Sequence, residues 1–201
     1  MVEAAQQPSE GPDEGARLML AWQAGDGPAF DALVRLHADR VHSLLVRFLG
    51  PHAPLDDLVQ EVFLRVIRSK ENYQPSARFT TWLFRIVYNL SVNHTQRRQP
   101  QALSMDGGLE EEGGIEVRDE VVADPSDSLQ REDVVRAVRL AIESLPERQR
   151  MALVLAKYEE QSYSEIGEVL DMTEKAVKSL VHRARENLRG ILAPLLTEEL
   201  L

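Results

Sequence analysis

The chain has 201 residues, of which 43% are hydrophobic and 28% charged, enough for one ordinary domain or two small ones. It contains no cysteine, which excludes disulfides, thiolate metal sites and cysteine nucleophiles. No apolar run approaches the roughly 20 residues of a membrane span, and the N-terminus lacks a secretory pattern, so we expect a soluble, cytoplasmic protein.

The net charge of −10 is concentrated in two segments. Residues 1–14 contain four acidic residues and no basic one, and residues 106–127 contain nine acidic residues and one basic one. Residues 15–105, in contrast, contain eleven basic and seven acidic residues. Attraction to phosphate depends on local charge, because salt screens charges over about 8–10 Å. The acidic balance of the whole chain therefore does not exclude a nucleic-acid partner.

Helical periodicity defines a first block over residues 14–98, after a polar tail at 1–13 that we expect to be disordered. Within the block we expect helices from Gly27-Pro28 to Gly50-Pro51, over 55–69 and over about 80–98, with a connecting segment from Lys70 to Arg78. The helix at 55–69 has the clearest pattern, because its apolar residues follow the i, i+3, i+4, i+7 rule as far as Ile67.

Residues 99–127 interrupt the periodicity with glycine pairs and an acidic run, and we expect an extended linker, because such a segment cannot offset its ordering entropy by burial. Helical spacing returns over 128–192, and 193–201 form a C-terminal tail. The predicted fold class is all-α: two small helical domains joined by an acidic flexible linker. The low aromatic content of 5% also favours helices over sheets.

The strongest local motif lies in the second block. Ser162 and Glu165 form a capping box that starts a short helix, and the turn at 171–173 leads to a longer basic helix. This is the helix-turn-helix plan, whose second helix enters the major groove. Its exposed positions include Lys175, Lys178, Ser179, His182 and Arg183. The alternative is a helical hairpin with a solvated basic face.

Two helices of the first block present further candidate surfaces. The outer face of helix 55–69 carries Leu64 among charged residues and suits a partner helix, although a single exposed leucine is common on any surface. The helix at 80–98 interleaves aromatic residues with arginines and asparagines, which suits single-stranded DNA. The alternative is that its aromatic residues, Trp82 above all, belong to the core and its arginines are solvated.

Motifs of enzymes are missing from the sequence. It contains no GxxxxGK[ST], GxGxxG, GxSxG or HExxH pattern. The five histidines show no metal-ligand spacing. We therefore expect no catalytic activity, no metal and no cofactor.

Two stretches of the first block, DDLVQEVFLR at 56–65 and FTTWLFRIVYN at 79–89, resemble conserved region 2 of bacterial sigma factors. In the second block LPERQR at 145–150, SYSEI at 162–166, AVKS at 176–179 and HRAR at 182–185 resemble their region 4. This order, with only a linker between the blocks, is typical of the extracytoplasmic-function (ECF) subgroup of the sigma-70 family.

The resemblance implies a role for each candidate surface. The residues that would bind the β′ clamp helices of RNA polymerase are Asp57, Gln60, Glu61, Leu64 and Arg65. Those that would bind the melted minus-ten strand are Arg78, Phe79, Thr80, Arg85, Tyr88, Asn89, Asn93 and Arg97. The helix-turn-helix would read the minus-thirty-five duplex, the acidic linker would thread the polymerase cleft, and the β flap of the polymerase would be a further contact of this chain. An anti-sigma factor is a further implied partner.

Three positions depart from the family pattern: Asp171 stands where glycine is usual, Leu180 where arginine is common, and Asn93 where aspartate is usual. The promoter sequence therefore cannot be carried over from relatives. The interpretation is an alternative sigma factor that joins core RNA polymerase, recognises promoters and stabilises minus-ten melting. The alternatives are a helix-turn-helix repressor or activator, which binds palindromic duplex DNA as a dimer, and a helical adaptor with no DNA role.

Overall fold

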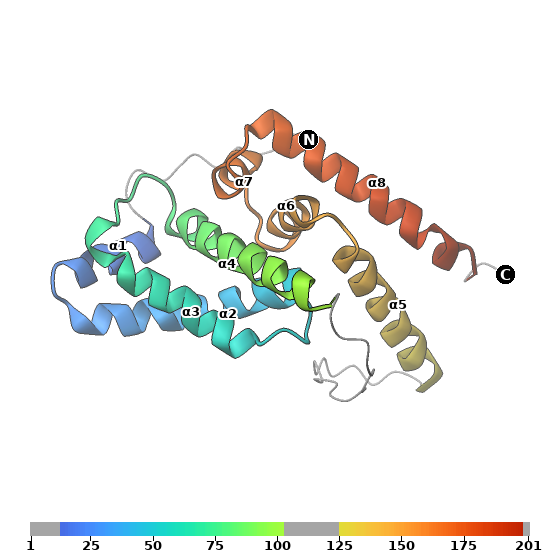
Figure 1. Ribbon diagram of the computed structural model, residues 1–201, viewed down its shortest axis with the longest axis horizontal. Coiled ribbons are helices and arrows are strands. Elements are labelled where there is room, and N and C mark those ends of the chain that lie inside the picture. Colours follow the sequence, from blue (N-terminus) through green and yellow to red (C-terminus); the bar gives the residue numbers. More distant parts are fainter. Residues whose placement is uncertain (1–12, 103–124, 199–201) are drawn as a thin grey trace.

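The computed structural model describes residues 13–102 and 125–198, and within these ranges it contains eight α-helices, one 3-10 turn and no strand (Figure 1). The elements are α1 (Glu14–Gln23), α2 (Gly27–Leu49), α3 (Leu55–Arg68), η1 (Lys70–Asn72), α4 (Phe79–Ala102), α5 (Pro125–Glu143), α6 (Glu147–Tyr158), α7 (Tyr163–Leu170) and α8 (Glu174–Glu198). The prediction of an all-α fold is confirmed. No helix of these ranges is long and apolar enough to cross a membrane.

Local signals account for the helix boundaries of the first block. Pro28 lies in the first turn of α2, and Gly50 ends that helix with a φ of 82°, a conformation that favours glycine. In α3, acidic residues occupy the first turn and arginines the last, which complements the helix dipole. The predicted helix from Gly27-Pro28 to Gly50-Pro51 is therefore confirmed.

One hydrophobic core extends through both blocks. Phe48, Phe79 and Phe84 are fully buried among α2, α3 and α4, and the same cluster continues into α6 and α7. There Met151, Leu155 and Ile166 are also fully buried. Figure 1 shows α7 beside one end of α4, with α8 on the outer side of α6 and α7. The two blocks therefore pack directly against each other.

Partly buried polar contacts cross the seam between the blocks. The Arg40 guanidinium forms an ion pair with the buried Glu159 carboxylate, donates a second hydrogen bond to the Glu159 carbonyl at 3.2 Å, and lies 5.2 Å from the centre of the Phe84 ring. Arg150 donates to the Phe48 carbonyl oxygen at 2.6 Å. Burying a charged group costs free energy unless the group is paired. The contacts with Arg40 therefore allow the two blocks to pack together without leaving the Glu159 carboxylate unpaired.

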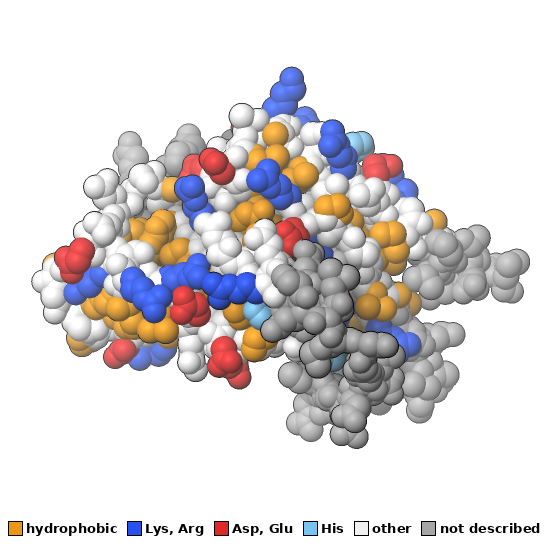
Figure 2. Space-filling model, in the orientation of Figure 1, with side chains coloured by type: hydrophobic (Ala, Val, Ile, Leu, Met, Phe, Trp, Pro, Cys, Tyr) orange, Lys and Arg blue, Asp and Glu red, His pale blue; other side chains and the backbone are white. Residues whose placement is uncertain are grey.

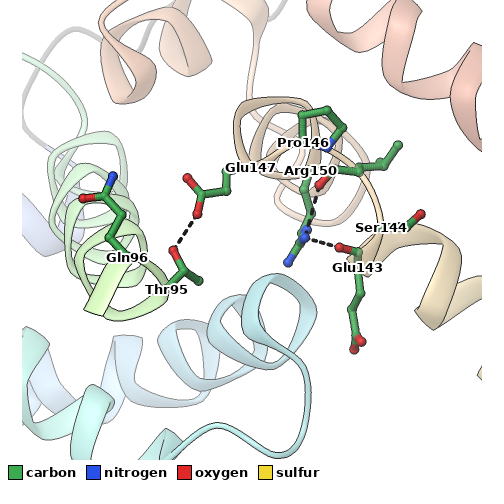
Figure 3. A pocket seen from close by; sticks show the side chains of 8 residues that line it. Thr95, Gln96, Glu143, Ser144, Pro146, Glu147 and Arg150 are labelled. Atoms are coloured by element: carbon green, nitrogen blue, oxygen red, sulfur yellow. Dashed lines mark hydrogen bonds between the residues drawn. The ribbon is translucent and has the colours of Figure 1, made fainter. Parts of the chain in front are cut away.

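A cavity of about 470 Å³ lies along this seam, between the end of α4 and the turn from α5 to α6 (Figure 3). Thr95 of α4 donates to the Glu147 carboxylate at 2.5 Å across it. The Arg150 guanidinium donates to the carbonyl oxygens of Glu143 and Leu145, and burial lowers its pKa. The polar groups of this cavity thus serve the contact between the blocks. No group of three acidic or histidine side chains in the described residues is placed to hold a metal ion.

The helices extend further than the sequence indicated. The linker expected at 99–127 begins inside α4 and ends inside α5, and residues 103–124 lie outside the described ranges, as do 1–12. The segment expected as a tail at 193–201 continues α8 as far as Glu198. Ile67 was expected to face inward but is 42% exposed, because the apolar stripe of α3 is wider than the face that its neighbours cover.

Candidate nucleic-acid interface

The loop from Tyr73 to Phe79 is anchored at both ends and open in the middle. Tyr73 and Phe79 are buried, whereas Gln74, Pro75 and Ser76 between them are exposed. The Phe79 ring lies 6.0 Å from Tyr73 and 5.4 Å from Trp82, measured between ring centres, and Tyr73 lies 4.9 Å from Trp82. Such aromatic clusters add stabilisation beyond area burial. The loop therefore presents its exposed backbone and polar side chains from a fixed base.

Two residues expected to contact DNA are buried, which corrects the sequence interpretation for their side chains. Phe79 is fully buried, and its ring lies 4.9 Å from that of His37. Thr80 is buried beside it. Trp82 is half-buried and packs against the core, as its alternative interpretation held. These residues support the loop and the start of α4 from beneath.

A polar stripe runs along the exposed face of α4. Arg85, Asn89, Asn93 and Arg97 are all exposed and follow one another at intervals of four residues. Side chains four apart lie on one helix face, and twelve residues of helix span about 18 Å. Tyr88 is half-buried, and its ring and that of Phe48 form an edge-to-face pair whose ring centres lie 6.3 Å apart. Arginines alternating with amides along one line can follow a phosphate backbone and hydrogen-bond unpaired bases.

The helix-turn-helix is built as predicted. The Glu165 amide donates to Ser162 Oγ at 3.3 Å, and the Ser162 amide donates to the Glu165 carboxylate at 2.8 Å, so the capping box is complete. Asp171 ends α7 with a φ of 54°, in the left-handed conformation for which glycine is the usual residue. Thr173 Oγ1 accepts a hydrogen bond from the Ala176 amide at 3.3 Å and caps α8.

The first residues of α8 separate into a buried and an exposed face. Val177, Val181 and Ala184 are buried against the other helices of the block. The predicted contact residues are all exposed: Lys175, Lys178, Ser179, His182 and Arg183. Figure 2 shows basic side chains gathered at the end of the molecule formed by α7 and α8, and further basic side chains over α3 and α4. The α8 face can therefore donate hydrogen bonds to phosphates and base edges.

The outer face of α3 combines apolar and charged groups. Leu64 is 44% exposed, beside an ion pair in which Arg65 donates to the Glu61 carboxylate at 3.0 Å. This hydrogen bond is the main reason that the pKa of Glu61 is lowered, and Arg68, 3.3 Å away, contributes to it. Asp57 and Gln60 are exposed on the same helix. The predicted residues thus form one surface, which we call the α3 face.

Sequence reasoning identified Arg78 as a minus-ten candidate and Glu165 as part of a capping box, but it did not predict the contact between them. Arg78 forms an ion pair with Glu165 at 3.3 Å, so the minus-ten candidate loop contacts the helix-turn-helix directly. Burial raises the pKa of Glu165, but hydrogen bonds from Ser162 and Arg78 outweigh it and lower the pKa overall. Asp13 also contacts this region, and its only sequence signal is its place before a helix. Contacts between residues so distant in the chain leave no periodicity.

Comparisons with known proteins agree with this geometry. Residues 33–101 match the family model of sigma-70 region 2, and residues 136–188 match that of sigma-70 region 4. The chain is 37% identical over 193 residues to the ECF RNA polymerase sigma factor SigE of Mycolicibacterium smegmatis, covering 93% of this chain and 70% of the relative. It is 31% identical over 168 residues to the ECF RNA polymerase sigma factor SigW of Bacillus subtilis, covering 82% and 89%.

A similar fold has been solved in the sigma factor RpoE of Bartonella quintana, in complex with the anti-sigma factor NepR. The TM-score is 0.65 at 21% sequence identity, and the match covers 82% of this chain and 96% of that one.

Proposed function

Because the chain belongs to the ECF group of the sigma-70 family, we propose that it binds core RNA polymerase and directs it to promoters, where it stabilises the melted minus-ten element. The observation that carries this proposal is the presence, on one chain, of the exposed arginine–asparagine stripe of α4 and of a helix-turn-helix. A repressor that binds duplex DNA needs only the helix-turn-helix. The α4 stripe has a role only if the protein also binds single-stranded DNA.

Each surface then has a part in initiation. The exposed part of the 73–79 loop, Arg78 and the α4 stripe bind the non-template strand, and the exposed residues of α8 read the minus-thirty-five duplex. The α3 face binds the β′ clamp helices of the polymerase, and the β flap is a further proposed contact. Each unstacked base costs a few kcal/mol, which binding to the α4 stripe offsets. Bond formation belongs to the polymerase, so this chain has no catalytic role of its own, and its place is the cytoplasm.

An anti-sigma factor is a further proposed partner. The solved relative from Bartonella quintana is bound to one, and a protein that covers the α3 face or the α8 face would keep this chain from polymerase and promoter. The chemistry of those faces, acidic and apolar on α3 and basic on α8, defines what such a partner has to complement.

Run-off transcription tests the proposal. Core polymerase is given fragmented genomic DNA with and without this protein, and we expect new discrete start sites that share paired upstream motifs. No new starts, together with tight binding of the free protein to a palindromic duplex, would establish the repressor instead. No new starts and no salt-dependent DNA binding would establish the adaptor.

Variants separate the surfaces. Glu61→Lys places a third cation beside Arg65 and Arg68 and should reduce co-elution with core polymerase about tenfold or more, because like charges replace an ion pair. Glu71→Lys, with the same change of charge at an exposed position of η1, is the matched control. Lys178→Ala should weaken use of the upstream element while co-elution stays normal. Normal co-elution of Glu61→Lys contradicts the assignment of the α3 face.

A further inference from the structure

Helix α1 lies outside the residues that match the region 2 family model, which begin at 33, yet it contacts both ends of the 73–79 loop. It is ten residues long and follows Asp13 directly. None of its residues belongs to the surfaces assigned above. Its contacts with the loop therefore need an explanation of their own.

The first contact is made by the Asp13 carboxylate. Its Oδ1 accepts a hydrogen bond from the Ala16 amide at 2.9 Å and so caps α1. Its Oδ2 accepts a hydrogen bond at 2.8 Å from the backbone amide of Phe79, and Phe79 is the first residue of α4. One carboxylate thus accepts hydrogen bonds at the N-termini of two helices, although Asp13 and Phe79 are 66 residues apart in the chain. This double role needs two acceptor atoms.

The second contact is made by Gln23, at the other end of α1. Its Nε2 donates to the Lys70 carbonyl oxygen at 2.5 Å and to the Tyr73 carbonyl oxygen at 3.0 Å, where the loop begins. Between the two ends, Gly15 packs so closely on Phe79 that an added Cβ would lie 2.6 Å from its ring. Helix α1 therefore fixes the start of the loop, its end, and the aromatic residue beneath it.

We propose that α1 braces the 73–79 loop in the conformation that accepts an unstacked base, with Asp13 and Gln23 as positioning residues. The inference rests on the proposed function, since it assumes that the exposed part of this loop binds the minus-ten strand. Ordering a free loop on binding costs free energy, and a loop already held at both ends avoids that cost. Affinity for the base then depends on a helix that does not touch DNA.

Asp13→Asn removes one contact and keeps the other. Asparagine caps a helix about as well as aspartate, so its amide oxygen can still accept from Ala16. Its NH₂ group, however, is a donor and cannot accept from the Phe79 amide. Asp26→Asn is the matched control, because Asp26 is the exposed N-cap of α2 and makes no side-chain cap hydrogen bond. Gln23→Leu is a second variant, which removes the donor and keeps most of the volume.

The assay is the affinity of holoenzyme for fork-junction DNA with a single-stranded minus-ten element, taken from a promoter that run-off transcription identifies. In a series of probes, each minus-ten base in turn is replaced by an abasic site. We expect the unmodified protein to lose affinity when one particular base is missing. Asp13→Asn and Gln23→Leu should bind the intact probe about tenfold more weakly than the unmodified protein. On the probe that lacks this base, the variants and the unmodified protein should have equal affinity. Asp26→Asn should match the unmodified protein on both.

Two results would overturn the proposal, and they differ. If Asp13→Asn and Gln23→Leu weaken binding to the intact and the abasic probes by the same factor, α1 stabilises the domain in general and does not position the loop. If the unmodified protein binds every abasic probe as tightly as the intact one, the loop accepts no base. In that case the role given to the loop under the proposed function fails together with the role of α1.

Discussion

We expect acid to lower the stability of this protein because His37 is buried in its neutral form. The side chain is buried beneath the 73–79 loop, with 6% of it exposed, and neither ring nitrogen has a hydrogen-bond partner. Burial, assisted by the nearby positive charge of Arg40, lowers the pKa of His37 from 6.5 to about 4, although the Asp13 carboxylate acts in the opposite direction. The imidazole is therefore neutral in the folded protein well below the pH at which it is protonated in the unfolded chain.

The direction of the effect follows from proton binding. Between pH 6.5 and about 4 the unfolded chain binds a proton at this residue and the folded protein does not, so stability falls as the pH is lowered. Above pH 6.5 the residue contributes no pH dependence. A difference of this size corresponds to about 3 kcal/mol at the acidic end. Few single residues change the stability of a domain by so much.

Urea unfolding at pH 7 and pH 4 measures the effect. His37→Leu removes the titrating group and two unpaired nitrogens. Between pH 7 and pH 4 the free energy of unfolding should therefore fall by about 3 kcal/mol less in this variant than in the unmodified protein. His42→Leu, at an exposed position of the same helix, should keep the full pH dependence. An equal loss in the His37 variant and the unmodified protein would refute the reasoning.

Two further substitutions test the helix-turn-helix and the seam. Gly167→Ala places a Cβ 2.5 Å from the Met172 carbonyl oxygen, so the turn between α7 and α8 has to shift. We expect the free energy of unfolding to fall by about 1–3 kcal/mol and the footprint at the upstream element to be lost. A normal footprint would contradict this. Arg40→Met leaves the buried Glu159 carboxylate without its ion-pair partner and should weaken docking of the two blocks by about 2 kcal/mol, less than for a fully buried pair because the Arg40 side chain is 39% exposed. Small-angle scattering would report a larger radius of gyration, and an unchanged radius would argue against this role.

Short-range features of the fold could be predicted from the sequence. The capping box of Ser162 and Glu165 and the glycine and proline at the ends of α2 depend on residues within a few positions of one another. Patterns over such distances reflect helix geometry directly. The α3 face was found in the same way, because its apolar stripe fixes which residues point outward.

Contacts over long distances could not be predicted. The sequence around Phe79, with an arginine before it and a polar helix after it, suggests a residue that stacks on a base. In the structure, however, α1 and His37 cover its ring. Arg40 and Glu159 are 119 residues apart in the chain. In the sequence, each is indistinguishable from a charged residue on the solvent-exposed surface. Whether such residues are core, seam or surface depends on how the helices pack, and helical periodicity contains no information about that.

Glu165 also limits which second block could be joined to this first block. Its carboxylate completes the cap of α7 and pairs with Arg78 in the other block, so one side chain has two structural roles. A chimera that joined this first block to the second block of a relative would keep the seam contact only if that relative had a carboxylate at the same place. Exchanging the two halves between relatives therefore has to preserve a pairing across the seam as well as the two DNA-binding surfaces.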